Sequence, residues 1–336
     1  GKKKTNVFIT IPKTAALGTY EGYITYTNQV NPEETYQVPF AIRTTKEGIE
    51  FVEILNKEIT TTKDYNAARR YTDVYLNLTS HMRTLDVFLV DGKTNEELGF
   101  IGTYDGMLMN EKVDLGIKHV FEGYYYPFTG DVDKPIAYNP KLAKQGSYKL
   151  KFVGTNDSGK AFSKESTIYI ESIAPELDLN IKEDVYEYTT EETTINVTGS
   201  IFDKETEDMK AAGFDVSQGS NEMFYHDQLG GRPVQIPVNE DGTFSVDIPI
   251  NQTRPMQLWF YGRDAASNQT WNNSRMIYFI REGEPHANMQ AEKIFANMGE
   301  SVQTTLTLDN VKNVREAVYT LVQYNTTLTE PIVTSH

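Results

Sequence analysis

The sequence predicts an all-β protein, a row of small β-sandwiches with an incomplete sandwich at each end. Apolar and polar residues alternate in many short runs, such as TDVYLNLTS, where Val74, Leu76 and Leu78 share one face. Tyr and Phe, at 21 and 16 residues, far outnumber the two Trp and favour strands. Gly, Pro, Asn and Asp separate the runs, and helical periodicity is weak.

The composition excludes several classes of function. Hydrophobic residues make up 39% and charged residues 24%, which is typical of a globular chain and too apolar for disorder. The net charge of −15 argues against nucleic acid and anionic membrane surfaces as partners, because both repel negative charge. No apolar run reaches the roughly 18 residues that membrane insertion needs. The chain has no cysteine, so disulfides and thiolate chemistry are absent.

Residues 1–45 predict only part of a domain. Strands are expected at Asn6–Ile11, Tyr20–Thr27 and Tyr36–Ile42, with Pro12 as punctuation. Three strands cannot cover two faces, so this segment is interpreted as the C-terminal part of a sandwich.

Residues 46–172 predict a complete second unit. Residues 102–146 are interpreted as a long aromatic insertion within it, which packs on the sandwich or presents a surface. The expected strands are Ile49–Leu55, Tyr71–Leu78, Asp86–Leu89, Ser147–Val153 and Ser166–Ile170.

Residues 173–282 predict a third unit, which begins at the junction Ile173-Ala174-Pro175. Apolar residues alternate on both sides of Glu240-Asp241-Gly242, which indicates a hairpin. The segment Asp203–Gly213 is either a helix with Asp203 as its cap or a polar loop. Seven strands, the number in an immunoglobulin-like sandwich, are expected at Glu176–Ile181, Thr194–Phe202, Met223–His226, Gln235–Val238, Thr243–Ile248, Met256–Arg263 and Arg275–Ile280.

Residues 283–336 predict the beginning of a further sandwich, with strands at Ser301–Leu308 and Ala317–Tyr324. The incomplete units at both ends indicate a fragment of a longer chain.

The third unit resembles bacterial immunoglobulin-like or fibronectin-like modules. The resemblance lies in GSIFDKETE, NEDGTFSVDIPI and GRDAASNQT, where Ser267 stands at a position usually held by glycine. The matched residues are Gly199, Asp203, Asp241, Gly242, Phe244, Asp264, Ala265 and Asn268.

The remaining units resemble domains that follow the catalytic domain of large secreted subtilisin-like proteases of Gram-positive bacteria, the lactocepin type. The first unit is similar to the end of their fibronectin-like domain, the second to the next domain, and the last to the opening of a cohesin-like module. The residues that carry this are Ile11-Pro12, Gly18, Tyr20, Gly22, Val38-Pro39-Phe40, Gly123-Tyr124-Tyr125, Gly146-Ser147-Tyr148, Gly299-Glu300-Ser301 and Leu308–Asn313.

The resemblance implies a non-catalytic accessory region of an extracellular or cell-wall-associated bacterial protease. Its partners would be its own catalytic domain and a protein substrate or cell-wall polymer. The alternative is an adhesin or surface-layer module that binds protein or carbohydrate, with no protease upstream. No catalytic residue is predicted, because none of the five histidines has a recognisable nucleophile beside it and no G-x-S-x-G motif occurs.

Calcium is the one cofactor that the sequence suggests. Asp131 and Asp133 place two carboxylates in a turn, a spacing that suits an oxygen-ligand site, although no full calcium-binding loop is present. The alternative is that each Asp bonds the backbone of its own turn.

Two further groups are singled out. Asp241, Gly242, Asp264 and Asn268 are predicted to be structural loop residues that bond nearby backbone N–H groups. Tyr124, Tyr125, Tyr126 and Phe128 are predicted to form a sugar- or peptide-binding platform or, alternatively, to pack over one sheet face.

Overall fold

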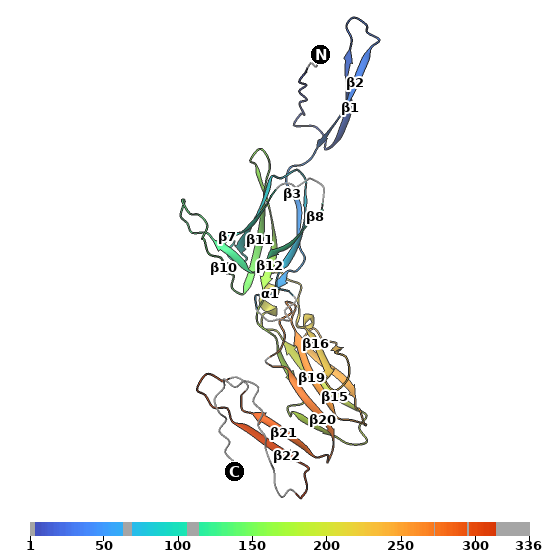
Figure 1. The fold of residues 1–336 in the computed structure, drawn as a ribbon, viewed down its shortest axis with the longest axis vertical. Coiled ribbons are helices and arrows are strands. Elements are labelled where there is room, and N and C mark those ends of the chain that lie inside the picture. Colours follow the sequence, from blue (N-terminus) through green and yellow to red (C-terminus); the bar gives the residue numbers. More distant parts are fainter. Residues whose placement is uncertain (1–3, 63–68, 106–113, 272, 294–295, 314–336) are drawn as a thin grey trace.

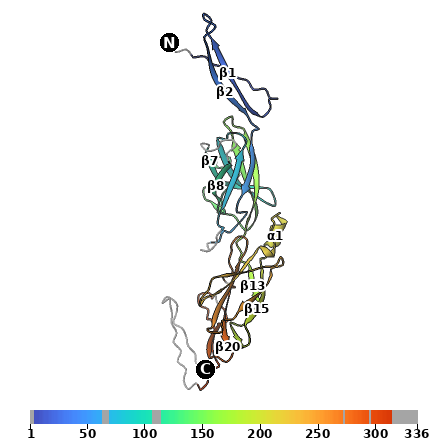
Figure 2. The same cartoon turned by 90° about the vertical axis from the view of Figure 1, so that its right-hand side faces the viewer.

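The structure is a computed structural model that describes residues 4–62, 69–105, 114–271, 273–293 and 296–313. It is nearly all β, as predicted, and its units follow one another along one axis (Figure 1). The same order along the long axis is visible after a quarter turn (Figure 2). The division into domains made from the sequence stays a prediction, and the sheets are described below by their strands.

The first element is an isolated hairpin of β1 (Gly18–Thr27) and β2 (Thr35–Thr44). Its register places Tyr20 opposite Ile42 and Ile24 opposite Val38, so one face is apolar along its whole length. The predicted strand at Asn6–Ile11 is wrong, because this segment has no strand pairing among the described residues. Alternation alone does not make a strand, since the backbone must also find a partner strand for its hydrogen bonds.

Sandwich A, as we name it, packs a three-stranded sheet of order β3-β5-β8 on a seven-stranded sheet of order β10-β9-β7-β6-β11-β12-β4. All five strands expected here from the sequence are present. The strands are β3 (Ile49–Ile54), β4 (Glu58–Ile59), β5 (Thr72–Leu78), β6 (Thr84–Asp91), β7 (Glu97–Asp105), β8 (Asp114–Phe121), β9 (Tyr124–Pro127), β10 (Lys141–Leu142), β11 (Gly146–Thr155) and β12 (Ala161–Ile170).

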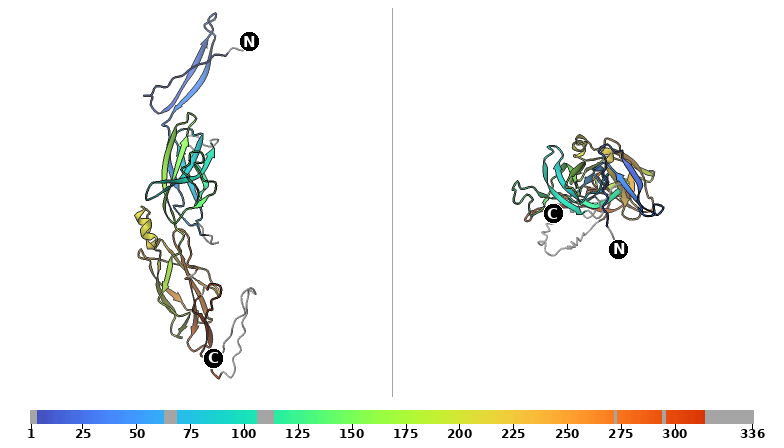
Figure 3. Two further views of the ribbon diagram at one scale, coloured as in Figure 1. Left: turned by 90° about the vertical axis from the view of Figure 1, so that its left-hand side faces the viewer. Right: turned by 90° about the horizontal axis from the view of Figure 1, so that it is seen from above.

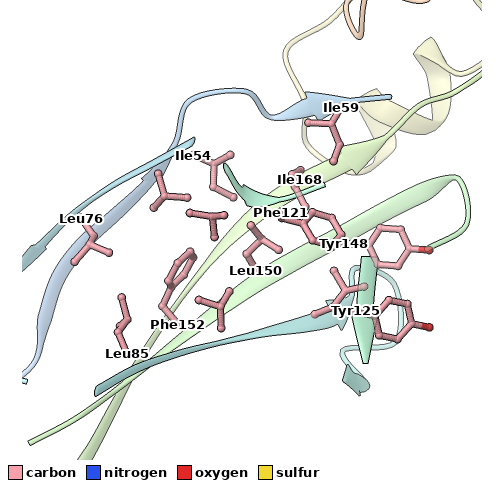
Figure 4. Close-up of a cluster of buried hydrophobic side chains, with 14 of the residues drawn as sticks. Ile54, Ile59, Leu76, Leu85, Phe121, Tyr125, Tyr148, Leu150, Phe152 and Ile168 are labelled. Atoms are coloured by element: carbon pink, nitrogen blue, oxygen red, sulfur yellow. The ribbon is translucent and has the colours of Figure 1, made fainter. Parts of the chain in front are cut away.

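The core of sandwich A follows directly from the strand periodicity. Val74, Leu76 and Leu78 on β5 are all 0% exposed, and they meet side chains of the facing sheet such as Leu150 and Phe152 (Figure 4). Each such side chain stabilises the fold by roughly 1.5–3 kcal/mol on burial. The predicted face of the run TDVYLNLTS is therefore confirmed.

The interpretation of residues 102–146 as an insertion is wrong in part. β8 lies inside this segment and pairs with β5, so it completes the smaller sheet, while β9 and β10 extend the larger one. Leu115 and Ile117 of β8 pack against the core, which explains why the strand belongs to the sandwich. The segment between β9 and β10 projects away from the sandwich, at the left of Figure 1.

Sandwich B packs a sheet of order β13-β15-β18 on a sheet of order β14-β20-β19-β16-β17. All seven expected strands are present, and β14 is an addition that the sequence did not reveal. The elements are β13 (Glu176–Leu179), β14 (Val185–Tyr188), β15 (Thr194–Phe202), α1 (Thr206–Ala211), the 3₁₀ turn η2 (Gln218–Ser220), β16 (Glu222–Asp227), β17 (Val234–Ile236), β18 (Thr243–Pro249), β19 (Met256–Arg263) and β20 (Arg275–Arg281).

Two local predictions for sandwich B are wrong. The turn at Glu240-Asp241-Gly242 is tight, but β17 before it pairs with β16 and β18 after it pairs with β15, so it connects two sheets and is no hairpin. Pro237 follows β17 and lacks the N–H needed to continue its pairing. Helix α1 begins at Thr206 with Glu205 at the cap position, so Asp203 is not its N-cap.

The last described element is a hairpin of β21 (His286–Ala291) and β22 (Thr304–Asp309) beside the far end of sandwich B (Figure 3). It confirms a strand near the predicted Ser301–Leu308. The strand predicted at Ala317–Tyr324 lies outside the described residues.

Candidate functional site

The predicted aromatic platform is split by strand alternation. On β9, Tyr125 points inward and is 8% exposed, whereas Tyr124 is 50% and Tyr126 36% exposed. Phe128, 37% exposed, packs its ring 6.0 Å from that of Phe88. The structure therefore separates one core residue from three residues that reach the surface.

The segment that follows β9 carries further exposed apolar residues. Val132 and Tyr138 are 93% and 94% exposed on the projecting segment between β9 and β10. Together with Tyr124, Tyr126 and Phe128 they form what we call the aromatic edge of sandwich A. Aromatic side chains with one apolar and one polar end are enriched at binding surfaces.

Asp131 and Asp133 lie in the same projecting segment and form a turn. The Asp133 N–H donates to Asp131 Oδ1 at 2.9 Å, and the Asp131 N–H donates to the Thr129 hydroxyl at 3.0 Å. Among the described residues, no three His, Asp or Glu side chains are grouped to hold a metal ion. Calcium at this turn stays a prediction, and the contacts match the alternative role of bonding the turn's own backbone.

Asp241 and Gly242 shape the sharp turn before β18. Asp241 Oδ1 accepts from the Thr243 hydroxyl at 2.6 Å and from the Thr243 N–H at 3.0 Å, and these bonds lower the pKa of Asp241. Gly242 has φ of 86°, and a Cβ there would lie 2.5 Å from the Ile201 carbonyl oxygen. Only glycine fits both conditions without strain.

Asp264 and Asn268 close the loop after β19. Asp264 Oδ1 accepts from the Asn268 N–H at 2.8 Å, the local bond that the sequence predicts for this loop. Ser267 between them has φ of 68°, which explains why glycine is usual at its position in similar modules. Both Asp264 and Asn268 are buried, at 3% and 4% exposed.

Asn268 also reaches across to sandwich A. Its Oδ1 accepts from the Thr60 hydroxyl at 2.6 Å, and its Nδ2 donates to the Glu171 carbonyl oxygen at 3.0 Å and to the Glu171 carboxylate. Thr60 follows β4, and Glu171 follows β12 and donates its N–H to the Ile59 carbonyl. One amide side chain therefore bonds two segments of the neighbouring sandwich.

The two carboxyl groups of this network are almost completely buried from solvent. Glu171 is 1% exposed and Asp264 is 3% exposed, and the side-chain amide of Asn268 donates to both carboxylates. Burial raises the pKa of Glu171 far above its ordinary range, and the neighbouring Asp264 raises it further. Burial also raises the pKa of Asp264. A carboxyl–carboxylate pair that shares one proton has this behaviour.

An apolar contact lies beside the polar network. Tyr169 of β12 packs edge-on against Phe214, with ring centroids 5.8 Å apart, and Met209 of α1 completes the cluster. The Tyr169 hydroxyl donates to Glu205 Oε2 at 3.2 Å, and burial raises the pKa of this phenol. We call this cluster and the Thr60–Glu171–Asp264–Asn268 network together the joint.

A polar cavity of about 550 Å³ opens beside the joint. Arg69 pairs with Glu58 from sandwich A, and Arg263 pairs with Glu222 from sandwich B. Both cations are therefore neutralised within the cavity. The lining residues are Glu58, Arg69, Asp215, Val216, Ser220, Glu222, Arg263, Asp264, Ala265 and Ser267.

Sequence reasoning found Asp264 and Asn268 but missed Thr60, Tyr169 and Glu171. One signal was present in the sequence: Glu171 interrupts an apolar run shortly before the junction proline Pro175. A charge at that place is unusual for a buried strand end and indicates a specific partner.

The sequence matches no known protein family, and no curated protein is similar to it in sequence. Among solved structures, the chain is similar to the fibronectin(III)-like modules of Clostridium thermocellum CbhA, with 11% sequence identity and a TM-score of 0.36. The match covers 69% of this chain and 94% of the CbhA chain. The FN1–FN3 domains of chicken CNTN1 match 79% of this chain and 76% of theirs at 11% identity, with TM-score 0.34.

A Ca²⁺-stabilised adhesin by which an Antarctic bacterium binds ice matches 81% of this chain and 60% of its own at 12% identity, with TM-score 0.30. Likenesses of this degree carry nothing about ligand or activity, and the sandwich architecture rests on the sheets described above. In the part of the chain that the structure describes, no helix has the length and apolar character to cross a bilayer.

Proposed function

We propose that this chain is a non-catalytic accessory region of an extracellular, cell-envelope subtilisin-like serine protease. It spaces the catalytic domain from the cell wall and contacts protein substrates or wall polymers. The observation that carries this proposal is the end-to-end arrangement of sandwiches A and B, joined through a buried network (Figure 1). A row of sandwiches with fixed relative orientation is suited to hold a catalytic domain at a distance from the cell wall.

The joint supports a mechanical role. Its carboxyl groups are engaged with each other and with Asn268, and neither accepts a bond from a histidine or approaches a nucleophilic hydroxyl in the described contacts. Acid–base catalysis needs a base within hydrogen-bond reach of the reacting proton. In the proposed role, these groups fix the orientation of sandwich A relative to sandwich B.

The test of this proposal has two arms. The purified chain incubated with casein is expected to give no cleavage, and turnover that disappears on mutating a histidine would overturn the non-catalytic role. The sequence encoded before Gly1 is expected to contain the rest of a fibronectin-like domain and, before it, a subtilisin-like catalytic domain. Further immunoglobulin-like repeats in its place would favour the second candidate.

The second candidate is an adhesin or surface-layer module without a protease. The exposed aromatic edge of sandwich A favours it, because Tyr124, Tyr126 and Phe128 reach solvent from one strand and its extension. Pull-down on insoluble cell-wall polymer is expected to fall at least about tenfold in a Tyr124→Ala/Tyr126→Ala variant, a loss typical of aromatic contacts at a binding centre. Tyr278→Ala, 43% exposed on sandwich B, is the matched control. Equal retention of the double variant and wild type would remove the aromatic edge as the contact surface.

A further inference from the structure

The joint contains two buried carboxyl groups, and no cation of the described residues is bonded to either. Glu171 accepts from the Ile173 N–H at 2.8 Å and from the Asn268 amide. Asp264 accepts from the N–H and the amide of Asn268, at 2.8 Å and 2.9 Å. All these donors are neutral. Two ionised carboxylates that accept from the same amide nitrogen, with only neutral donors bonded to them, repel each other strongly in a buried site.

The charged groups around the pair do not relieve this repulsion. Asp203, 5% exposed in the loop before α1, adds negative potential to both carboxyl groups. Glu205 and Asp208 lie beside Tyr169 on the same side. Arg69 and Arg263 line the cavity that Asp264 borders, but each is paired with its own glutamate. Arg70, next to Arg69 in the sequence, has buried Nε and Nη2 atoms, but these have no hydrogen-bond partner among the described residues. Within the described part of the chain, a proton is therefore the positive charge left to relieve the repulsion between the two carboxyl groups.

We infer that Glu171 and Asp264 share one proton across the joint, so that sandwiches A and B are held together in acidic medium and gain freedom to move as the medium becomes alkaline. Glu171 belongs to sandwich A through its backbone bond to Ile59, and Asp264 belongs to the loop after β19 in sandwich B. The proton thus lies between the two bodies.

The direction of the pH effect follows from proton linkage. When the joint opens, Glu171 meets water and releases its proton at its ordinary pKa of 4.5, whereas the closed joint retains it. Closing therefore takes up a proton. The equilibrium constant for closing is at its full value below pH 4.5 and falls by up to about tenfold for each pH unit above it.

The experiment uses the full chain, which has no native cysteine. Spin labels are attached at Lys164→Cys on sandwich A and Glu240→Cys on sandwich B, two exposed positions without a side-chain bond among the described contacts. The distribution of the label-to-label distance is measured by pulsed electron resonance at about pH 5, close to the start of the linkage range, and at about pH 8, well inside it. We expect a narrow distribution at the acidic pH and a broader one at the alkaline pH.

The Glu171→Gln variant tests whether loss of the proton from Glu171 causes the broadening of the distance distribution at alkaline pH. The amide has the shape of the protonated acid and cannot ionise, so we expect its distribution to stay narrow at both pH values. Glu191→Gln makes the same substitution at an exposed position of sandwich B and is expected to behave as wild type.

Equal widths for the wild type at the two pH values would overturn the inference. A Glu171→Gln variant that broadens with pH as the wild type does would also overturn it. If that variant does not fold, the wild-type comparison and Asp264→Asn, which also removes the like-charge contact, decide the question. This inference does not depend on a protease parent, since it concerns only the contact between the two sandwiches.

Discussion

The two ends of sandwich A are connected to their neighbours in opposite ways. Toward the N-terminal hairpin, the link carries Glu47, which pairs with Lys160 at 2.6 Å while both side chains remain about half exposed. Toward sandwich B, the joint buries Glu171, Asp264 and Asn268 almost completely. Exposed ion pairs contribute little because water and salt screen them, whereas buried polar groups are costly when their partners are lost.

We therefore expect the molecule to bend at the link to the N-terminal hairpin more readily than at the joint to sandwich B. At the first link, Gly48 is bonded to Thr79 and Ser80. Among the described residues, however, no side chain of the hairpin belongs to the buried core of sandwich A, so we expect the direction of the hairpin to be less fixed. The joint combines an apolar cluster with a buried hydrogen-bond network centred on the Asn268 amide. Such networks specify geometry more strongly than they add stability.

The largest effect is expected for Asn268→Ala. The substitution removes the acceptor of Thr60 and the donor shared by Glu171 and Asp264, and leaves buried polar groups unpaired. We expect a loss of about 3 kcal/mol in the free energy of unfolding of sandwich B, from penalties of roughly 1–3 kcal/mol per orphaned group. Denaturant unfolding followed by the fluorescence of Trp259 and Trp271, both in sandwich B, measures it.

Asn196→Ala is the control for this variant. Its side chain also bonds two neighbours, Ser245 and Asp247, but on an exposed sheet face. If both variants lose the same stability, the joint is no more important than a surface network and the comparison fails.

A smaller effect is expected for Tyr169→Phe. The change keeps the packing of the ring against Phe214 and removes only the bond to Glu205. A net hydrogen bond contributes about 1 kcal/mol, so the midpoint of unfolding is expected to fall modestly. If Tyr169→Phe lowers the free energy of unfolding as much as Asn268→Ala does, the Tyr169 hydroxyl is as important for the joint as the Asn268 amide. The proposed order of the two contacts would then be wrong.

The smallest effect is expected for Lys160→Ala at the opposite link. The Lys160–Glu47 pair is exposed, and such pairs contribute roughly 0.2–1 kcal/mol, less at high salt. Differential scanning calorimetry at low and high salt measures the change. A loss that exceeds that of Tyr169→Phe would reverse the order proposed for the two connections.

Much of the fold could be predicted because strand alternation is a local property. The buried face of β5 and the seven expected strands of sandwich B follow from residues close in sequence. Pairing is not local. The segment Asn6–Ile11 alternates well but has no partner, and the strands on either side of Gly242 separate into different sheets.

The candidate site shows the same division. The bond between Asp264 and the Asn268 backbone could be predicted, since it closes a five-residue loop. The contacts of Asn268 with Thr60 and Glu171 could not, because 208 and 97 residues separate these partners along the chain. Their proximity depends on how two complete sandwiches dock.

If the buried joint makes sandwiches A and B one rigid body, both must adopt the same orientation in a weakly aligned sample. Residual dipolar couplings of the backbone N–H groups of the full chain measure this orientation. In slightly acidic buffer, we expect that a single alignment tensor fits both sandwiches of the wild type and that two different tensors are needed after Asn268→Ala. Different tensors for the two sandwiches of the wild type would contradict it.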